Sequence, residues 1–363
     1  MRVLLTTGIY PPEIGGPATY VPQLARYLIE CGHEVTVLTL RKKGITHEEN
    51  HAWQVKCVPP FSFLPLRVLA TIITIVRLAK KHDFIFSNGL YFESGLALAL
   101  VKRPSIVKVV GNPIWERSRN KKKHLTESNK SYLRCPSKLE RIQLRIIAFA
   151  LSRFKWVTCP SQALCEDVRS WGLKSSPIFI PNGVVVREPT PTKKEFNVIA
   201  VSRLVNWKNT DVLIESCAYL GVNLCLIGDG PELVQLQNLA VSLKANVLFV
   251  GELPAGEIPE YLDRSQCFVL ISDYEGLSFS LLEAMNCRVP VIVSDVPGNR
   301  SVVQSIQNGV VVREISPNEV SKAISKILNS DNSVMIENSY QLIRENYDIK
   351  TNFRKILDLL ESQ

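Results

Sequence analysis

The chain has 363 residues, of which 46% are hydrophobic and 21% charged, which excludes the disordered and fibrous classes of protein. Its length predicts two domains of roughly 150–200 residues each. The net charge of +9 is uneven: residues 1–190 hold 28 Lys and Arg against 13 Asp and Glu, and residues 191–363 hold 15 against 21. The excess of positive charge in the first half predicts that this half binds an anionic partner: a nucleic acid, an anionic membrane or a phosphorylated acceptor. The alternative is that the first half simply has a basic, solvated surface.

Cysteine and histidine spacing offers no framework for disulfides or metals. Nine cysteines are scattered without a Cys-x-x-Cys pair, and the five histidines lack metal-ligand spacing. We therefore expect reduced core thiols and no metal site. The chain opens directly on a strand pattern, and the apolar run from Val68 to Val76 is far shorter than the roughly 20 residues that span a bilayer. These features predict a cytoplasmic protein.

The first half alternates strand and helix patterns. Arg2–Thr6 is an apolar strand, Thr19–Glu30 has helical spacing, and Glu34–Leu40 is a second strand, which together form the βαβ pattern of a parallel sheet. The pattern continues with helices at Arg67–Lys81 and Lys138–Ser152, strands at Phe84–Ser87, Ile106–Val110 and Trp156–Cys159, and a helix N-cap at Ser161. In Arg67–Lys81 the polar residues form one stripe on an otherwise apolar helix.

Linker chemistry follows at Pro181–Glu195, where an Asn-Gly pair and two further prolines interrupt the pattern. A second βα series then begins at Asn197–Val201. We therefore divide the chain into residues 1–185 and residues 186–345, two Rossmann-like domains, and residues 346–363, a C-terminal helix that could cross back to the first domain.

Ligands of open parallel sheets bind where the strands end, so the loops after strands carry the candidate site. Gly15-Gly16 precedes the first helix, where the backbone can approach an anion closely. Arg203 and Lys208 follow the first strand of the second half, and two cations at one strand end suit a diphosphate, although both could simply face solvent. Gly228-Asp229-Gly230-Pro231 is a tight turn and not the G-x-G-x-x-G dinucleotide fingerprint.

The most informative segment runs from Glu275 to Glu283, after an apolar strand and into a helix. Gly276 places Glu275 in the loop, and Glu283 falls in the first turns of the helix. Both carboxylates can then face one pocket, with free backbone N–H groups between them. The alternative is structural: Ser280-x-x-Glu283 reads as a capping box, in which Glu283 bonds back to the Ser280 N–H.

These residues resemble a known family. Glu275 through Glu283 looks like the E-x7-E motif of the retaining glycosyltransferases of family 4. Ile9–Gly16, Ser161, Pro181–Val184, Ser202–Asn209 and Gly228–Pro231 match further signatures of the family in the same order, over nearly the whole chain. The resemblance implies the α/β GT-B fold, in which two Rossmann-like parallel-sheet domains face each other across a cleft. It also implies that residues 1–185 are the acceptor-side domain and that residues 186–345 are the nucleotide-sugar-binding domain.

The family then implies a role for each matching residue. Glu275 would contact the donor sugar, Glu283 would bond the donor ribose, and Arg203 and Lys208 would neutralise the diphosphate leaving group. Donor binding would also involve Gly15, Gly16, Gly228, Gly230, Gly251, Gly276, Leu277, Ser278, Phe279 and Ser280. Family members usually need no metal and no bound cofactor, since the nucleoside-diphosphate sugar is a co-substrate.

Two positions depart from the family pattern. Asn112 stands near the acceptor site, where many members carry His and a subgroup carries Asp; Asn cannot act as a general base but can orient a hydroxyl. Val185 stands where an Asp often follows Asn-Gly-Val. Activity is still compatible with Asn112, because in a retaining front-face reaction the leaving phosphate can accept the acceptor proton.

The resemblance implies transfer of a hexosyl unit from a UDP- or GDP-sugar to a glycan or lipid-linked acceptor, in surface polysaccharide or glycolipid synthesis. A catalytically impaired nucleotide-sugar-binding protein, a same-fold epimerase and a glycogen-synthase-like polymerase are alternatives. A NAD-dependent oxidoreductase lacks its fingerprint, and no nucleic-acid motif accompanies the charge. The basic half predicts peripheral contact with an anionic inner membrane face: Arg67–Lys81 and Lys138–Ser152 could lie on a bilayer, although burial explains them equally well.

Overall fold

The computed structural model describes residues 1–13, 15–40, 52–60, 62–116, 137–188, 190, 192–304 and 307–362. Residue contacts divide the chain into two units. The first unit comprises residues 1–111, 136–181 and 350–363, and the second comprises residues 112–135 and 182–349. Each unit is built on one parallel β-sheet, which confirms the predicted pair of Rossmann-like domains.

The first unit has a seven-stranded sheet in the order β3-β2-β1-β4-β5-β6-β7. Val3 in β1 pairs with Val35 in β2 on one side and with Phe84 in β4 on the other. The strands are β1 (Arg2–Thr7), β2 (Glu34–Leu40), β3 (Gln54–Val58), β4 (Phe84–Asn88), β5 (Ser105–Lys108), β6 (Trp156–Cys159) and β7 (Ile178–Phe179). The helices are α1 (Gly16–Glu30), α2 (Leu64–Ala79), α3 (Tyr91–Leu100), α5 (Lys138–Leu151), α6 (Gln162–Ser170) and α14 (Ile349–Glu361).

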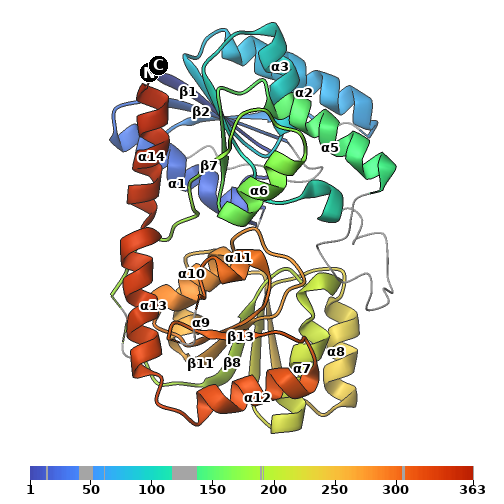
Figure 1. Cartoon of the computed structure of the whole chain (residues 1–363), viewed down its shortest axis with the longest axis vertical. Helices are drawn as coiled ribbons and strands as arrows, with labels where there is room; N and C mark the ends of the chain where they lie inside the picture. Colours follow the sequence, from blue (N-terminus) through green and yellow to red (C-terminus); the bar gives the residue numbers. More distant parts are fainter. Residues whose placement is uncertain are drawn as a thin grey trace. The chain divides into compact units, whose positions relative to one another are not determined.

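Helices cover both faces of this sheet. The chain proceeds from β1 to β2 in one direction and from β4 to β5 and β6 in the other, so right-handed crossovers place the intervening helices on opposite faces. Helices α2, α3 and α5 lie together, away from α1 and α14 (Figure 1). Tyr20 of α1 makes an edge contact with Phe353 of α14 at a ring-centroid distance of 5.2 Å, so the C-terminal helix packs within the first unit.

Most helix predictions in this unit are confirmed within a few residues. Ser161 caps α6 by accepting a hydrogen bond from the Leu164 N–H, as predicted. The predicted polar stripe of Arg67–Lys81 is only partly exposed in the structure, where Arg77 of α2 faces solvent. Thr71 is buried, with its hydroxyl donating to the Arg67 carbonyl oxygen at 2.7 Å, so the helix backbone satisfies this side chain inside the protein.

The second unit has a six-stranded sheet in the order β10-β9-β8-β11-β12-β13. Its strands are β8 (Phe196–Val201), β9 (Leu224–Ile227), β10 (Val247–Gly251), β11 (Ser265–Leu270), β12 (Val291–Ser294) and β13 (Val310–Val312). Its helices are α7 (Thr210–Leu220), α8 (Leu233–Ser242), α9 (Ile258–Asp263), α10 (Phe279–Asn286), α11 (Pro297–Arg300), α12 (Pro317–Leu328) and α13 (Ser333–Asn346), with a short 3-10 helix η2 at Asn206–Lys208. One buried cluster includes α10, and another includes α7 and α12.

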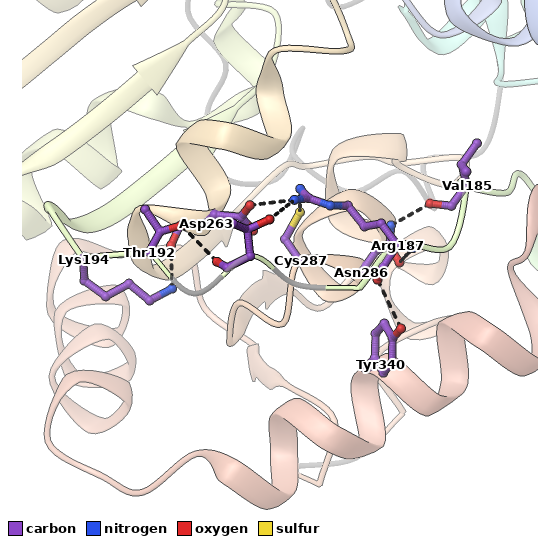
Figure 2. A network of polar contacts seen from close by, with 9 residues as sticks. Val185, Arg187, Thr192, Lys194, Asp263, Asn286, Cys287 and Tyr340 are labelled. Atoms are coloured by element: carbon purple, nitrogen blue, oxygen red, sulfur yellow. Dashed lines mark hydrogen bonds and ion pairs between the residues drawn. The ribbon is translucent and has the colours of Figure 1, made fainter.

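Val185 and Arg187, which follow the boundary between the units, are bonded to the rest of the second unit. Arg187 forms an ion pair with Asp263 at 2.8 Å, and its carbonyl oxygen accepts a hydrogen bond from the Tyr340 hydroxyl (Figure 2). Asn286, the last residue of α10, donates to the carbonyl oxygen of Val185. Asp263 is only 6% exposed in its side chain, so Arg187 neutralises a nearly buried charge. The predicted linker is therefore attached at several points to the unit that it enters.

All eight cysteines in the described ranges are free thiols, and Cys135 lies outside those ranges. Within the described part of the chain, no helix is both long enough and apolar enough to cross a bilayer.

Candidate functional site

The candidate site lies at the carboxyl ends of the strands of the second sheet. The strand order reverses between β8 and β11, because the chain runs outward from β8 to β10 on one side and from β11 to β13 on the other. At such a switch point the two following loops diverge and leave a crevice in which α/β proteins bind ligands. The loops after β8 and β11 carry the predicted Arg203, Lys208 and Glu275.

Lys208 and Glu275 form an ion pair across this switch point. The Lys208 Nζ lies 2.5 Å from the Glu275 Oε1, and the two side chains are only 15% and 11% exposed. The residues are 67 positions apart in the sequence. Because the pair is largely shielded from water, its attraction is stronger than that of a surface salt bridge. The fold therefore brings together two of the residues that the sequence singled out.

Asn209 holds the two loops in register beside this pair. Its backbone adopts a left-handed conformation with φ of 49°, which Asn tolerates better than most residues. Its side-chain amide donates to the Ile271 carbonyl oxygen at 2.8 Å and to the Asp273 carboxylate at 2.9 Å. The Asp273 N–H in turn donates to the Trp207 carbonyl oxygen. These bonds fix where Lys208 and Glu275 emerge.

The Arg203 side chain is exposed, and no hydrogen bond or ion pair joins it to another side chain or to the backbone within the described residues. It follows the same strand as Lys208, so this strand end offers one paired cation and one uncommitted cation. A guanidinium and an ammonium at one strand end can together neutralise a diphosphate.

The glycines after β9 fit against the loop that carries Arg203. A Cβ atom on Gly228 would lie 2.0 Å from the Ser202 carbonyl oxygen, and one on Gly230 would lie 2.1 Å from the Leu204 carbonyl oxygen. The Gly228 N–H donates to the carbonyl oxygen of Gly251 at 2.7 Å. These three predicted positions therefore pack three adjacent loops closely, and only glycine allows the approach at Gly228 and Gly230.

The helix that follows Glu275 begins earlier than the capping-box alternative required. Ser278 is the N-cap of α10 and accepts a hydrogen bond from the Leu281 N–H, whereas Ser280 is the second helical residue. The Ser280-x-x-Glu283 capping box is therefore not formed. Ser280 instead shares a hydrogen bond of 2.9 Å with the Ser278 hydroxyl. Glu283 is thus not used as a cap.

The loop between Glu275 and α10 is fixed by burial and by a hydrogen bond to a distant residue. Gly276 and Leu277 are buried, and the Leu277 carbonyl oxygen accepts a hydrogen bond from the Asn182 side chain at 2.9 Å. Phe279 opens the helix, whose first N–H groups and dipole favour an anion.

Glu283 lies on α10, and no ion pair from the described residues reaches it. Burial raises the pKa of Glu283 to about 8, well above its ordinary value of 4.5. At neutral pH the carboxyl group therefore holds its proton, and it can both donate and accept a hydrogen bond.

This pKa predicts how stability depends on pH. The unfolded chain loses the Glu283 proton near pH 4.5, whereas the folded chain keeps it to about pH 8. The contribution of Glu283 to the free energy of unfolding therefore falls as pH rises through that window and is level above it. Because Gln cannot ionise, Glu283→Gln is expected to be more stable than the wild type by about 2–4 kcal/mol at pH 8 and nearly equal to it at pH 4.5.

Urea unfolding of both proteins at pH 4.5, 6 and 8 measures this difference. Glu257→Gln, at an exposed carboxyl, is the control and should show no such trend. A difference between Glu283→Gln and wild type that stays constant with pH would contradict the raised pKa.

Asn112 takes a structural position beside these loops. Its side-chain oxygen accepts hydrogen bonds from the Ile114 and Trp115 N–H groups, so it caps a short helical turn at residues 113–116. Its own N–H donates to the Tyr274 hydroxyl at 3.0 Å, next to Glu275. Among the described residues, Asn112 therefore bonds to the backbone of its own turn and to Tyr274.

Sequence reasoning missed an aromatic cluster in the second unit. The Trp115 ring lies 4.8 Å from the Tyr274 ring and 6.0 Å from the Trp207 ring, measured between centroids. Two of the three residues directly precede Lys208 and Glu275 in the chain. Because Trp207 and Tyr274 stand next to Lys208 and Glu275 in the chain, the sequence could have indicated that these two aromatic residues belong to the site. The contact of Trp115 with both loops depends on the fold.

Gly298 was also missed. A Cβ atom at Gly298 would lie 2.1 Å from the carbonyl oxygen of Glu275, so α11 packs directly against the loop that carries this carboxylate. Gly15 and Gly16 begin α1 in the first unit, where Gly15 has φ of 150° and its carbonyl oxygen accepts from the Thr19 N–H. Within the described ranges, no three His, Cys, Asp or Glu side chains are grouped as a metal site.

Comparisons with known proteins agree over both halves of the chain. Residues 186–345 match the family described as Glycosyl transferases group 1, and residues 14–188 match Glycosyltransferase Family 4. An uncharacterized glycosyltransferase of Methanocaldococcus jannaschii is 28% identical, over 99% of this chain and 98% of its own length. The GDP-mannose-dependent alpha-(1-6)-phosphatidylinositol monomannoside mannosyltransferase of Mycolicibacterium smegmatis is 26% identical, over 90% of this chain and 89% of its own length.

A solved structure shares the fold. Anabaena HepE, crystallised in complex with UDP and glucose, superposes with a TM-score of 0.80 at 19% identity, covering 100% of both chains.

Proposed function

The chain is a glycosyltransferase of family 4 with the GT-B fold, a hexosyltransferase that uses a nucleotide sugar, and from that premise we propose that its second unit binds a UDP- or GDP-hexose. In this proposal the enzyme transfers the hexose, with retention, to a glycan or lipid-linked acceptor. The observation that carries the proposal is the shielded Lys208–Glu275 ion pair at the switch point of the second sheet, with Arg203 on the same strand end. Because the chain belongs to this glycosyltransferase family, the alternatives of an oxidoreductase and of a nucleic-acid binder have no support.

The donor diphosphate fits the loop after β8. Breaking the bond between the sugar and the diphosphate adds negative charge to the leaving group, and cations that stand in place before the reaction stabilise that charge most. Arg203 is exposed toward solvent and Lys208 is fixed by Glu275, so one cation can swing onto the diphosphate while the other is already positioned. In this arrangement Glu275 would contact the donor sugar where it adjoins the diphosphate.

Glu283 would meet the donor ribose. A carboxyl group with a pKa of about 8 holds its proton at neutral pH, so it can donate one hydrogen bond and accept others from a ribose diol. On the family pattern, we also propose Gly15 and Gly16 as donor-binding residues. These roles require no metal ion, because Arg203 and Lys208 supply the positive charge.

The acceptor proton needs a destination other than Asn112. The side-chain oxygen of Asn112 already accepts two backbone hydrogen bonds, and an amide is not basic enough to take a proton. A leaving-phosphate oxygen on the side of attack can accept it, in agreement with a retaining front-face reaction. The relative named for its action on phosphatidylinositol monomannoside supports a lipid-linked acceptor.

Thermal melting with and without nucleotides tests the donor site. We expect UDP or GDP at about 100 times its Kd to stabilise the protein by about 2.7 kcal/mol without added metal. Arg203→Ala should remove most of that shift, whereas Arg313→Ala, at an exposed arginine after the edge strand β13, should retain it. No shift with any nucleoside diphosphate, or equal shifts in both variants, would contradict the proposed site.

Turnover separates the enzyme from its alternatives. Release of UDP or GDP from a nucleotide sugar that depends on an added lipid or glycan acceptor supports transfer. Nucleotide binding without turnover on any acceptor would favour an impaired binding protein, and conversion of the free nucleotide sugar into its epimer would favour an epimerase.

A further inference from the structure

A short segment of the second unit, residues 112–116, contacts the loop that carries Glu275. The segment follows β5 in the chain but belongs to the second unit. The Tyr274 hydroxyl accepts a hydrogen bond from the Asn112 N–H at 3.0 Å, and the Tyr274 ring lies 4.8 Å from the Trp115 ring. The residue that directly precedes Glu275 therefore holds this segment twice, once through its hydroxyl and once through its ring.

The segment is also ordered by its own hydrogen bonds. The Asn112 side-chain oxygen accepts from the Ile114 and Trp115 N–H groups at 3.2 Å and 3.1 Å. The Asn112 carbonyl oxygen accepts from the Glu116 N–H at 3.1 Å, which closes the turn. Side-chain bonds of this kind fix a turn locally. The Tyr274 hydroxyl thus binds the one residue on which the whole turn depends.

The same segment reaches the loop after β8 through an aromatic contact. The Trp115 ring meets the Trp207 ring nearly edge-on, at 80° between the planes and 6.0 Å between centroids, which is a favoured geometry of aromatic pairs. The two loops are also joined directly, because the Asp273 N–H donates to the Trp207 carbonyl oxygen at 2.8 Å. The segment and the two loops therefore form a closed circuit of contacts, in which a shift of one changes its contacts with the other two.

This circuit includes the neighbours of the two charges to which we assign the transfer step. Trp207 precedes Lys208, and Tyr274 precedes Glu275. In the proposed reaction the bond from the hexose to the diphosphate breaks, a bond to an acceptor hydroxyl forms, and the hydroxyl proton leaves with the diphosphate. When water replaces the acceptor, the products are free hexose and nucleoside diphosphate. An acceptor that is held in the right orientation has a large advantage over water, which is not held.

We propose that Tyr274 is a positioning residue for the acceptor: it holds residues 112–116 against the Glu275 loop, so that the acceptor hydroxyl meets a preformed surface beside the donor sugar. The inference rests on the proposed function, since it places the hexose at Glu275. Tyr274 acts through the segment and needs no contact with substrate. Loosening the segment should therefore impair use of the acceptor, and it should spare donor binding and donor hydrolysis, because Lys208 and Glu275 keep their ion pair.

Tyr274→Phe tests this role, because it removes the hydroxyl and keeps the ring. The donor is UDP-glucose or GDP-mannose, chosen by the nucleoside diphosphate that raises the melting temperature, and the acceptor probes are octyl glucoside and octyl mannoside. We expect kcat/KM for the acceptor to fall about tenfold, the loss that corresponds to one hydrogen bond. Nucleotide release without acceptor, which measures donor hydrolysis, should stay within about twofold of wild type. The melting shift with nucleotide should also be retained.

Two variants of Trp115 test the ring contacts of the same circuit. Trp115→Ala removes the ring that meets both loops and should lower kcat/KM for the acceptor by about 100-fold, the cost of a small misplacement of a reacting group. Trp115→Phe keeps an aromatic ring against Tyr274 and should recover about tenfold of that loss. Donor hydrolysis should stay near the wild-type rate in both variants.

The matched control is Tyr340→Phe, which also removes a hydrogen-bonded tyrosine hydroxyl from the second unit. The Tyr340 hydroxyl donates to the Arg187 carbonyl oxygen at 3.1 Å, and Tyr340 lies on α13, outside the loops after β8 and β11. Its loss should lower the melting temperature about as much as Tyr274→Phe does. The ratio of transfer to donor hydrolysis should stay at the wild-type value, which separates positioning of the acceptor from a general loss of stability.

Three results would overturn the inference. In the first, Tyr274→Phe transfers hexose to the octyl glycosides as well as wild type does. In the second, its transfer and its donor hydrolysis fall by the same factor, which would assign the effect to the donor or to the fold. Both leave the proposed function standing. In the third, the wild type transfers hexose to no acceptor, and the proposed function then fails together with the inference that rests on it.

Discussion

Replacing Lys208 by Met is expected to lower kcat for sugar transfer by about 10²–10³-fold, the loss typical when one preorganised electrostatic group is removed. Lys208 is held at 2.5 Å from Glu275, so in the proposed mechanism its charge is in place before the diphosphate leaves. Methionine keeps the length of the side chain and removes only the charge. Because we propose that this charge acts mainly on the leaving group, kcat and kcat/KM should fall together.

Initial rates at saturating donor and acceptor measure this loss. Lys322→Met is the matched control, because Lys322 also forms an ion pair, with Glu319, but on the exposed surface of α12, and its variant should keep full activity. Lys208→Met also leaves the Glu275 carboxylate unpaired and should lower the free energy of unfolding by about 1–3 kcal/mol. A Lys208→Met enzyme within about threefold of wild-type kcat would remove Lys208 from the transfer step.

Replacing Gly298 by Ala is expected to lower the free energy of unfolding by about 2–4 kcal/mol and the transfer rate at least tenfold. The added methyl group would stand 2.1 Å from the Glu275 carbonyl oxygen and 2.6 Å from its carbonyl carbon. Both are backbone atoms, so no side-chain rotation relieves the overlap. Either α11 or the Glu275 loop must move, and the second movement displaces the carboxylate from Lys208.

Gly256→Ala is the control for this substitution, because no atom lies within 4 Å of a Cβ atom built there. Denaturant unfolding and initial rates of the two variants, measured side by side, separate the steric effect from the general effect of adding a methyl group. A Gly298→Ala protein as stable and active as Gly256→Ala would show that α11 does not position Glu275.

The alternation of strands and helices could be predicted from the sequence, because it depends on local hydrophobic period and on turn residues. Ser161 is one instance: its N-cap role is a local hydrogen bond to the Leu164 N–H, and the residue type alone indicates it. The glycines at 228 and 230 are another, since a tight turn after a strand needs them wherever the strand lies.

The capping-box alternative, which rests on local sequence, is wrong because a distant segment competes. Ser280-x-x-Glu283 satisfies the pattern of a capping box, yet α10 starts at Phe279 with Ser278 as its cap. The preceding Leu277 is buried and tied by its carbonyl oxygen to Asn182, which lies 95 residues earlier in the chain. That tie sets where the helix begins, and no window of local sequence contains it.

The sequence by itself determined the two parallel-sheet units, the loops that follow their strands, and the family, because each depends on residue type and order along the chain. Only the tertiary structure decided which of those loops meet. β8 and β11 lie side by side because the sheet reverses its order between them, so Lys208 reaches Glu275 across 67 residues. It also decided which sides of α2 and α5 face the core: both helices have more apolar surface than one packing face can cover, and only packing shows which part remains in contact with solvent.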